Sequence, residues 1–130
     1  MDIREYDIKA LAYIGDAVYE LYVRKHIMEN SHEQVNKLHK KAIKYVSAKA
    51  QAHVIAVLEN KFTNEEQAIF KRGRNAVSNT VPKNTDVITY KIATGFEAVI
   101  GYLYLINDTA RLDYILAESI QAIENKKEEI

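Results

Sequence analysis

The chain has 130 residues, of which 48% are hydrophobic and 28% charged, a size and balance typical of one ordinary globular domain. It has no cysteine, which excludes disulfide scaffolds, thiolate zinc sites and cysteine nucleophiles and suits a reducing compartment. There is no signal-peptide pattern, and no apolar run approaches the roughly 20 residues of a membrane helix. We therefore expect a single domain over residues 1–130, in the cytoplasm and without a membrane partner.

Apolar residues recur at helical spacing along almost the whole chain, which predicts an all-α fold. Two capping boxes, Ser31 with Gln34 and Thr63 with Glu66, mark helix starts. In chain order the predicted helices span Ile8–Met28, a segment from the Ser31 cap to about Tyr45, Ser47–Leu58, a segment from Thr63 that breaks at Gly73, Asp86–Ile106 and Ala110–Ile123. Residues 73–85 have loop composition, 107–109 form a turn, and a frayed tail begins at about residue 124.

The zero net charge conceals a strong segregation along the chain. Residues 37–91 contain eleven Lys or Arg and four Asp or Glu, a local net charge of +7 that the flanking segments cancel. Such asymmetry indicates a surface for a polyanion. The alternative is a chance cluster of lysines on solvated helix faces.

The first predicted helix is apolar on nearly all sides, apart from Asp16 and Glu20 one turn later. A helical wheel assigns its core face to Leu11, Ile14, Val18, Leu21 and Tyr22, with Ala12, Tyr13, Tyr19 and Val23 on the same side as Asp16. A helix that is apolar on both sides needs a second burial surface, which predicts a homodimer. Two acids one turn apart on such a helix are costly unless a cation binds there.

The helix over residues 86–106 repeats this pattern with Glu97. Its predicted core face contains Ile92, Phe96, Val99, Leu103 and Ile106, and Glu97 projects opposite, beside the small residues Ala93 and Gly101. Carboxylates without cysteine favour Mg²⁺ or Mn²⁺ over zinc, and the four histidines lack metal-binding spacing. The alternative is that Asp16 and Glu97 are solvated or paired with nearby cations.

A basic loop follows the fourth predicted helix. Its candidate phosphate-contacting residues are Lys71, Arg72, Arg74, Asn75, Lys83 and Asn84. Guanidinium, ammonium and amide groups of this kind position a nucleic acid without reading its sequence. The alternative is a solvated connection between helices. A basic loop and two acids suited to a hard cation together indicate phosphodiester hydrolysis.

Three segments resemble the ribonuclease III nuclease domain. Residues 11–18, LAYIGDAV, resemble its signature helix, and residues 93–104, ATGFEAVIGYLY, resemble its second motif with the glutamate at Glu97. The loop residues 72–76 and 81–86 are similar to the Mini-ribonuclease III branch, which lacks the double-stranded RNA-binding domain of the larger enzymes. The larger enzymes have two further acids. At the first of these positions this chain has Lys9 or Ala12, and at the second it has Thr94.

The resemblance implies that Asp16 and Glu97 are catalytic, metal-binding acids in a helical homodimer. It further implies Mg²⁺-dependent cleavage of double-stranded RNA to 5′-phosphate ends, with Mn²⁺ as a substitute, in maturation of both ends of precursor 23S ribosomal RNA. A ribosomal protein that presents this RNA is a further candidate partner. Glu20 is a candidate additional metal ligand. The alternatives from other classes are a non-catalytic helical RNA-binding dimer and a structural dimerisation domain.

Overall fold

The computed structural model describes residues 2–77, 80–83 and 85–128, and within them every regular element is a helix, which confirms the all-α prediction. The elements are η1 (Ile3–Glu5), α1 (Ile8–Glu29), α2 (Val35–Val46), α3 (Ala48–Leu58), η2 (Glu59–Lys61), α4 (Asn64–Arg74), α5 (Val87–Leu105) and α6 (Thr109–Glu128). No helix in the described part of the chain is long and apolar enough to cross a bilayer.

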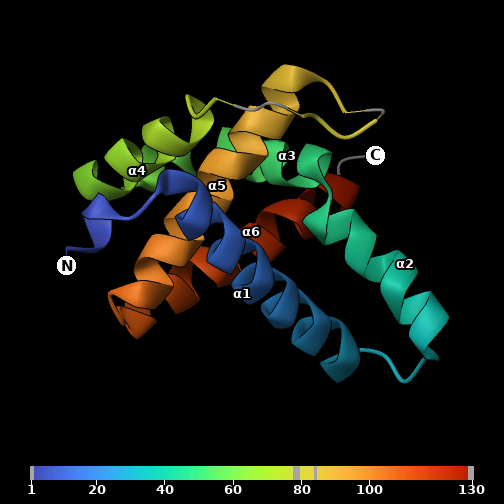
Figure 1. Cartoon of the computed structure of the whole chain (residues 1–130). Coiled ribbons are helices and arrows are strands. Elements are labelled where there is room, and N and C mark those ends of the chain that lie inside the picture. The colour runs from blue at the N-terminus through green and yellow to red at the C-terminus, as the bar shows by residue number, and fades with distance from the viewer. Residues whose placement is uncertain (1, 78–79, 84, 129–130) are drawn as a thin grey trace.

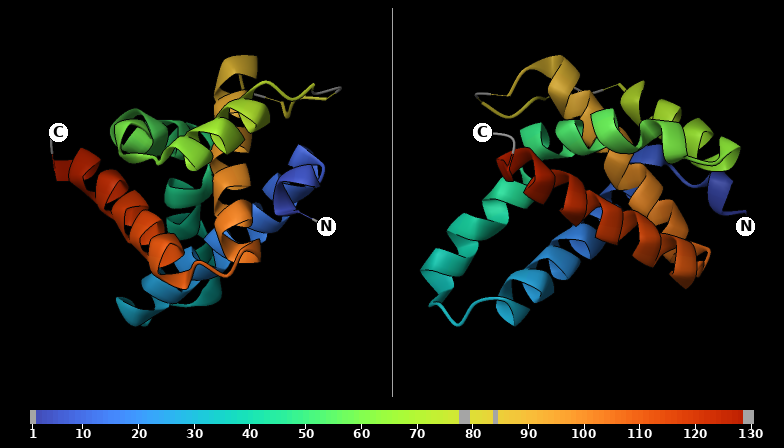
Figure 2. Two further views of the ribbon diagram at one scale, coloured as in Figure 1. Left: turned by 90° about the vertical axis from the view of Figure 1, so that its left-hand side faces the viewer. Right: turned by 180° about the vertical axis from the view of Figure 1, so that it is seen from behind.

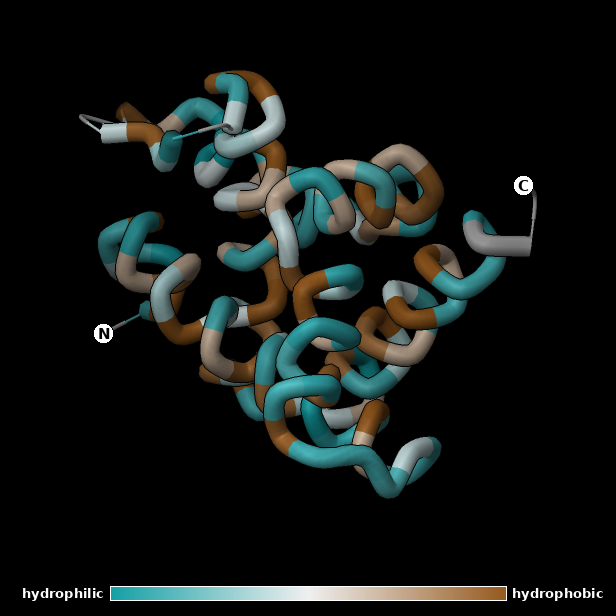
Figure 3. The backbone as a smooth tube through the Cα atoms, turned by 90° about the vertical axis from the view of Figure 1, so that its right-hand side faces the viewer, coloured by the Kyte–Doolittle hydropathy of each residue, from teal (hydrophilic) through white to brown (hydrophobic). Residues whose placement is uncertain are grey.

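Helix α5 lies at the centre of the structure. It packs most extensively against α1, α4 and α3, and α6 covers it from behind (Figures 1 and 2). Its buried residues occupy every side of the helix, among them Phe96, Val99, Ile100 and Leu103. The apolar residues are spaced along all the helices rather than gathered in one segment, as a bundle of amphipathic helices requires (Figure 3). The predicted non-core side of α5, from which Glu97 projects, is therefore an interface with other helices.

Glycines allow α1 and α4 to approach α5 at backbone distance. A Cβ atom on Gly15 would overlap the carbonyl oxygen of Glu97, and one on Gly101 would overlap the carbonyl oxygen of Leu11. Gly73 of α4 also packs against α5, where an added Cβ would lie 2.8 Å from the Gly95 Cα. Direct backbone contacts therefore fix the position of α5 relative to α1, and neither helix can shift far.

The predicted core face of α1 is only partly right. Leu11 is buried, but Leu21 is 71% exposed, whereas Tyr19 and Val23, assigned to the opposite side, are fully buried. Tyr19 packs edge-on against Phe96 and donates a hydrogen bond to the Tyr45 carbonyl oxygen. The helical-wheel prediction of the core face is wrong here because α1 is apolar on nearly all sides. The spacing of its apolar residues therefore could not indicate which side meets α5.

The predicted helix starts have different outcomes. Ser31 does not cap α2, which begins at Val35 after Gln34 and has no side-chain cap bond. The capping box of Thr63 and Glu66 is confirmed. Glu66 is 2% exposed and also accepts two hydrogen bonds from the Arg111 guanidinium, at 2.7 and 2.8 Å, which tie α4 to α6. The half-buried Arg111 thus neutralises the buried glutamate of this box.

The C-terminal part of the chain is more ordered than its sequence suggests. The predicted turn after α5 is confirmed: Asn107 has a φ of 61°, and the amides of Asn107 and Asp108 return to the carbonyls of Tyr104 and Leu103. The frayed tail predicted from about residue 124 is wrong, because α6 continues to Glu128. Glu124 accepts a hydrogen bond from the Tyr45 hydroxyl and pairs with His26, which holds this end of α6 against α1 and α2.

Candidate active site

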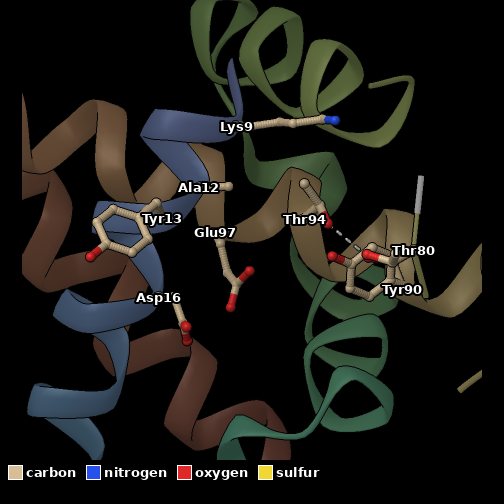
Figure 4. A pocket seen from close by; sticks show the side chains of 8 residues that line it. All are labelled: Lys9, Ala12, Tyr13, Asp16, Thr80, Tyr90, Thr94 and Glu97. Atoms are coloured by element: carbon tan, nitrogen blue, oxygen red, sulfur yellow. Dashed lines mark hydrogen bonds between the residues drawn. The ribbon is translucent and has the colours of Figure 1, made fainter. Parts of the chain in front are cut away.

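The two acids singled out from the sequence lie in one pocket. Asp16 extends from α1 and Glu97 from α5, and both carboxylates point into the same space (Figure 4). The pocket has a volume of about 340 Å³ and opens to solvent. Its lining residues are Lys9, Ala12, Tyr13, Asp16, Thr80, Tyr90, Thr94 and Glu97. The close packing of Gly15 against Glu97 is what places the two acids side by side.

The environment of Glu97 favours its uncharged form. Burial is the main cause, followed by the negative charge of Asp16 and the hydrogen bond to it, and together they raise the pKa of Glu97 to about 8. A hydrogen bond donated by Gln51 Nε2, at 3.3 Å from Glu97 Oε2, acts in the opposite direction. The one cation that lines the described pocket, Lys9, extends away from the carboxylates (Figure 4). With both carboxylates ionised, the site would hold more negative charge than its own cations balance.

The set of candidate ligands is small. In the described part of the chain no cluster of three or more His, Asp, Glu or Cys side chains is arranged to hold a metal. Glu20, considered as an extra ligand, does not line the pocket and instead pairs with Arg24 at 3.3 Å. Thr94, at one of the positions where larger enzymes carry an acid, donates its hydroxyl to the Tyr90 carbonyl oxygen. The pocket therefore offers two carboxylates and several neutral oxygens.

The predicted basic loop is divided between a helix and a loop. Lys71, Arg72 and Arg74 lie in the last turn of α4, where positive charge is favourable, and Asn75 caps it. The prediction that they lie on a loop is wrong because Gly73, taken as a helix breaker, is a packing residue against Gly95.

These cations differ in their surroundings. Lys71 and Lys83 are exposed, and Arg74 lies over the Phe70 ring. Arg72 donates from Nη1 to the Arg4 carbonyl oxygen at 2.9 Å and so also braces the N-terminal segment. Asn84 lies outside the described residues. The connection between α4 and α5 reaches the pocket at Thr80, whereas the described basic residues of this segment do not line it.

Gln51, the α3 residue that contacts Glu97, was not predicted as a site residue from the sequence. It is 1% exposed although it lies in an alanine-rich segment whose pattern marks no functional position. Only tertiary packing, which brings α3 against α5 across 46 positions of sequence, reveals the contact.

Comparison with known proteins identifies the family. The model of the Ribonuclease III domain matches residues 9–108, which include both acids and the basic residues between positions 71 and 84. The chain belongs to the ribonuclease III family. It is an endoribonuclease of the class that acts on double-stranded RNA, and the resemblance noted in its sequence is confirmed.

Several curated relatives share most of the chain. The Mini-ribonuclease 3 of Streptococcus pneumoniae is 50% identical over 88% of this chain and 91% of its own length. That of Clostridium tetani is 46% identical over 98% of this chain and 85% of its own length. A crystal structure of a Fusobacterium nucleatum protein, 33% identical, superposes with a TM-score of 0.83 and covers 92% of this chain and 96% of that one. The helical arrangement of this chain thus matches that of the solved Fusobacterium nucleatum protein in overall course.

Proposed function

We propose that Asp16 and Glu97 hold a divalent cation, Mg²⁺ or its substitute Mn²⁺, with which this ribonuclease III enzyme hydrolyses the phosphodiester bonds of double-stranded RNA. The observation that carries the proposal is the convergence of two carboxylates from α1 and α5 in one pocket with too little positive charge to balance them. A hard cation at this point would relieve their repulsion. Like-charged groups this close otherwise require one of them to bind a proton.

The residues present fit Mg²⁺ rather than a softer metal. Apart from the Lys9 ammonium group, which repels a cation, the polar side-chain atoms that line the described pocket are oxygens, from two carboxylates and from threonine and tyrosine hydroxyls. Mg²⁺ keeps several waters and is commonly held by only one or two carboxylates, so two protein ligands are sufficient. When bound, the cation lowers the pKa of an attacking water and stabilises charge on the phosphate.

The chain's own residues provide binding and orientation around this centre. Asp16 and Glu97 hold the cation and keep it against α1 and α5. Lys71, Arg74, Asn75 and Lys83, with Arg72 as a braced member, contact phosphates of the duplex, and we include Asn84 on its sequence alone. Water attack with departure of the 3′-oxygen leaves a 5′-phosphate on one product and a 3′-hydroxyl on the other.

We further propose that the enzyme is a homodimer that joins along α1. Three exposed apolar side chains follow one face of this helix, Tyr13 at 81%, Leu21 at 71% and Met28 at 61% exposure. The small Ala17 lies between them on the same face. Tyr19 and Val23, the earlier candidates, are excluded from this surface because they are buried within the chain. Since Tyr13 also lines the pocket, a partner bound here would border the acid pair.

The substrate that the resemblance supports is the base-paired ends of precursor 23S ribosomal RNA, in the cytoplasm, with a ribosomal protein as a candidate presenting partner. The name of the similar proteins, Mini-ribonuclease 3, supports only the nuclease class. The test incubates the chain with a duplex made from the two ends of that precursor, with Mg²⁺ or with EDTA, beside an unrelated duplex of equal length. Cleavage in Mg²⁺ at positions unique to the precursor duplex supports the proposal, and equal cutting of both duplexes contradicts the substrate assignment.

A further inference from the structure

Gln51 is the most deeply buried polar side chain at the acid pair. It lies near the start of α3 and is 1% exposed, while the pocket itself opens to solvent. Its Nε2 donates to Glu97 Oε2 at 3.3 Å and to the carbonyl oxygen of Val46 at 3.1 Å. One amide group thus connects the end of α2, the start of α3 and the acid on α5.

The orientation of this amide is determined by its partners. The Val46 carbonyl oxygen belongs to the last residue of α2, where carbonyls have no partner within the helix, and it can only accept a hydrogen bond. Turning the amide over would bring Oε1 against that carbonyl and would place two acceptors together in a buried site. Nε2 must therefore face Val46 and Glu97.

The same orientation leaves the other end of the amide without a donor. Gln51 Oε1 is buried and accepts no hydrogen bond from any described residue. A buried acceptor without a donor is unfavourable, and such a group in a native protein calls for an explanation, for which a water or an ion at the site is one. The orphaned atom is part of a side chain that already contacts one of the two candidate metal-binding acids.

We propose that Gln51 is a positioning residue for the cation site, which orients the Glu97 carboxylate through Nε2 and offers Oε1 to a hydrogen-bond donor that enters with the hydrated cation. This inference rests on the proposed cation site of Asp16 and Glu97. The donated hydrogen bond fixes one oxygen of Glu97, whose carboxyl group also contacts Asp16. Metal-ligating carboxylates in proteins are oriented by hydrogen-bonded neighbours in this way.

The chain provides a matched control for a test. Gln67 is also partly buried, and its Nε2 donates to a glutamate, Glu59 Oε2, at 2.9 Å, but neither residue lines the pocket. Gln51→Met therefore removes an amide–carboxylate hydrogen bond at the acid pair, and Gln67→Met removes the same kind of bond elsewhere in the chain. Methionine keeps the length of the side chain and fills the space with an apolar group.

The primary measurement is binding of Mn²⁺ alone to the full chain, followed by the electron paramagnetic resonance signal of free Mn²⁺, with melting temperature with and without Mg²⁺ as a second readout. We expect Gln51→Met to lose about 10-fold or more in Mn²⁺ affinity and to lose most of the stabilisation by Mg²⁺. Gln67→Met should match the wild type in both. Binding of an RNA duplex in EDTA should be unchanged in either variant.

The outcomes separate this inference from the proposed function. If the wild type binds Mn²⁺ and Asp16→Asn abolishes binding, but Gln51→Met binds as tightly as the wild type, the role of Gln51 is overturned and the cation site stands. If Asp16→Asn and Glu97→Gln bind Mn²⁺ like the wild type, both proposals fail. Gln51→Leu is the second variant for the case that Gln51→Met does not fold, and failure of both to fold would assign Gln51 a purely structural role and overturn the proposal.

Discussion

Gly15 of α1 lies directly against the carbonyl group of Glu97, so the residue that precedes one acid of the pocket touches the backbone of the other. Gly101, one turn after Glu97, makes the reciprocal contact with the Leu11 carbonyl. The separation of the two carboxylates is therefore determined by backbone packing of α1 on α5. Neither acid has to be positioned by a flexible loop, which suits a site that must hold its ligands at a defined spacing.

Gly15→Ala should disrupt this spacing. The added Cβ has no space against the Glu97 carbonyl, so α1 must move, at a cost of about 2–3 kcal/mol in folding free energy even after the helix preference of alanine. We expect a lower melting temperature and a loss of most cleavage under single-turnover conditions. Ala68→Ser, at an exposed position on α4, should have little effect on either. A Gly15→Ala enzyme of normal activity would show that the acids tolerate a wider spacing.

The raised pKa of Glu97 makes the stability of the metal-free protein depend on pH. Its pKa is about 8 in the folded chain against an ordinary value of 4.5, so between these values the folded state binds more protons than the unfolded state. Stability should therefore fall as pH rises from 4.5 to 8. Relative to Glu97→Gln, which has no proton to lose, the melting temperature of the wild type in EDTA should drop by roughly 5 °C or more between pH 5 and pH 8.5. Parallel curves for the two proteins would contradict the shifted pKa.

Lys71 and Lys83 should contribute phosphate contacts that depend on salt. Both are exposed. Replacing both with alanine should weaken duplex binding and reduce the slope of log affinity against log salt concentration by about two. Lys25→Ala with Lys61→Ala is a control with the same loss of charge, because these lysines pair with Glu29 and Glu118. Equal slopes for the two double variants would remove the basic segment from the RNA-binding surface.

Leu21→Glu should separate the proposed dimer. A charge at this exposed apolar position would be buried without a partner between two copies of α1. Sedimentation should give roughly 30 kDa for the wild type, twice the 14.9 kDa chain, and the monomer mass for the variant. Val57→Glu, at an exposed apolar position on α3, should stay dimeric. A monomeric wild type at micromolar concentration would refute the dimer.

Much of the fold could be predicted from local patterns, and the failures have a common physical origin. The order of the main helices, the Thr63 capping box and the turn at Asn107 depend on neighbouring residues and are confirmed, whereas the start of α2 and the end of α6 were predicted wrongly. The inward side of α1 could not be predicted because the helix has apolar residues on every side. Likewise Gly73 resembles a helix breaker in sequence, whereas its role depends on Gly95 of another helix.

The candidate site divides in the same way. Asp16 and Glu97 could be selected because each is an acid in an otherwise apolar helix, and their shared pocket is what such a placement predicts. Gln51 could not be selected, since a glutamine in a helix ordinarily faces solvent and only the packing of α3 on α5 buries it.

The most direct test of the account is single-turnover cleavage of an RNA duplex by Asp16→Asn, by Glu97→Gln and by the double variant, with melting curves in EDTA and in Mg²⁺. An amide keeps the shape of each side chain but removes the charge that a hard cation requires. We expect each single variant to lose most of its cleavage, the double variant to cleave about as slowly as the worse single one, and none to be stabilised by Mg²⁺ as the wild type is. Retained cleavage in either single variant, or multiplicative losses in the double variant, would contradict a shared cation site.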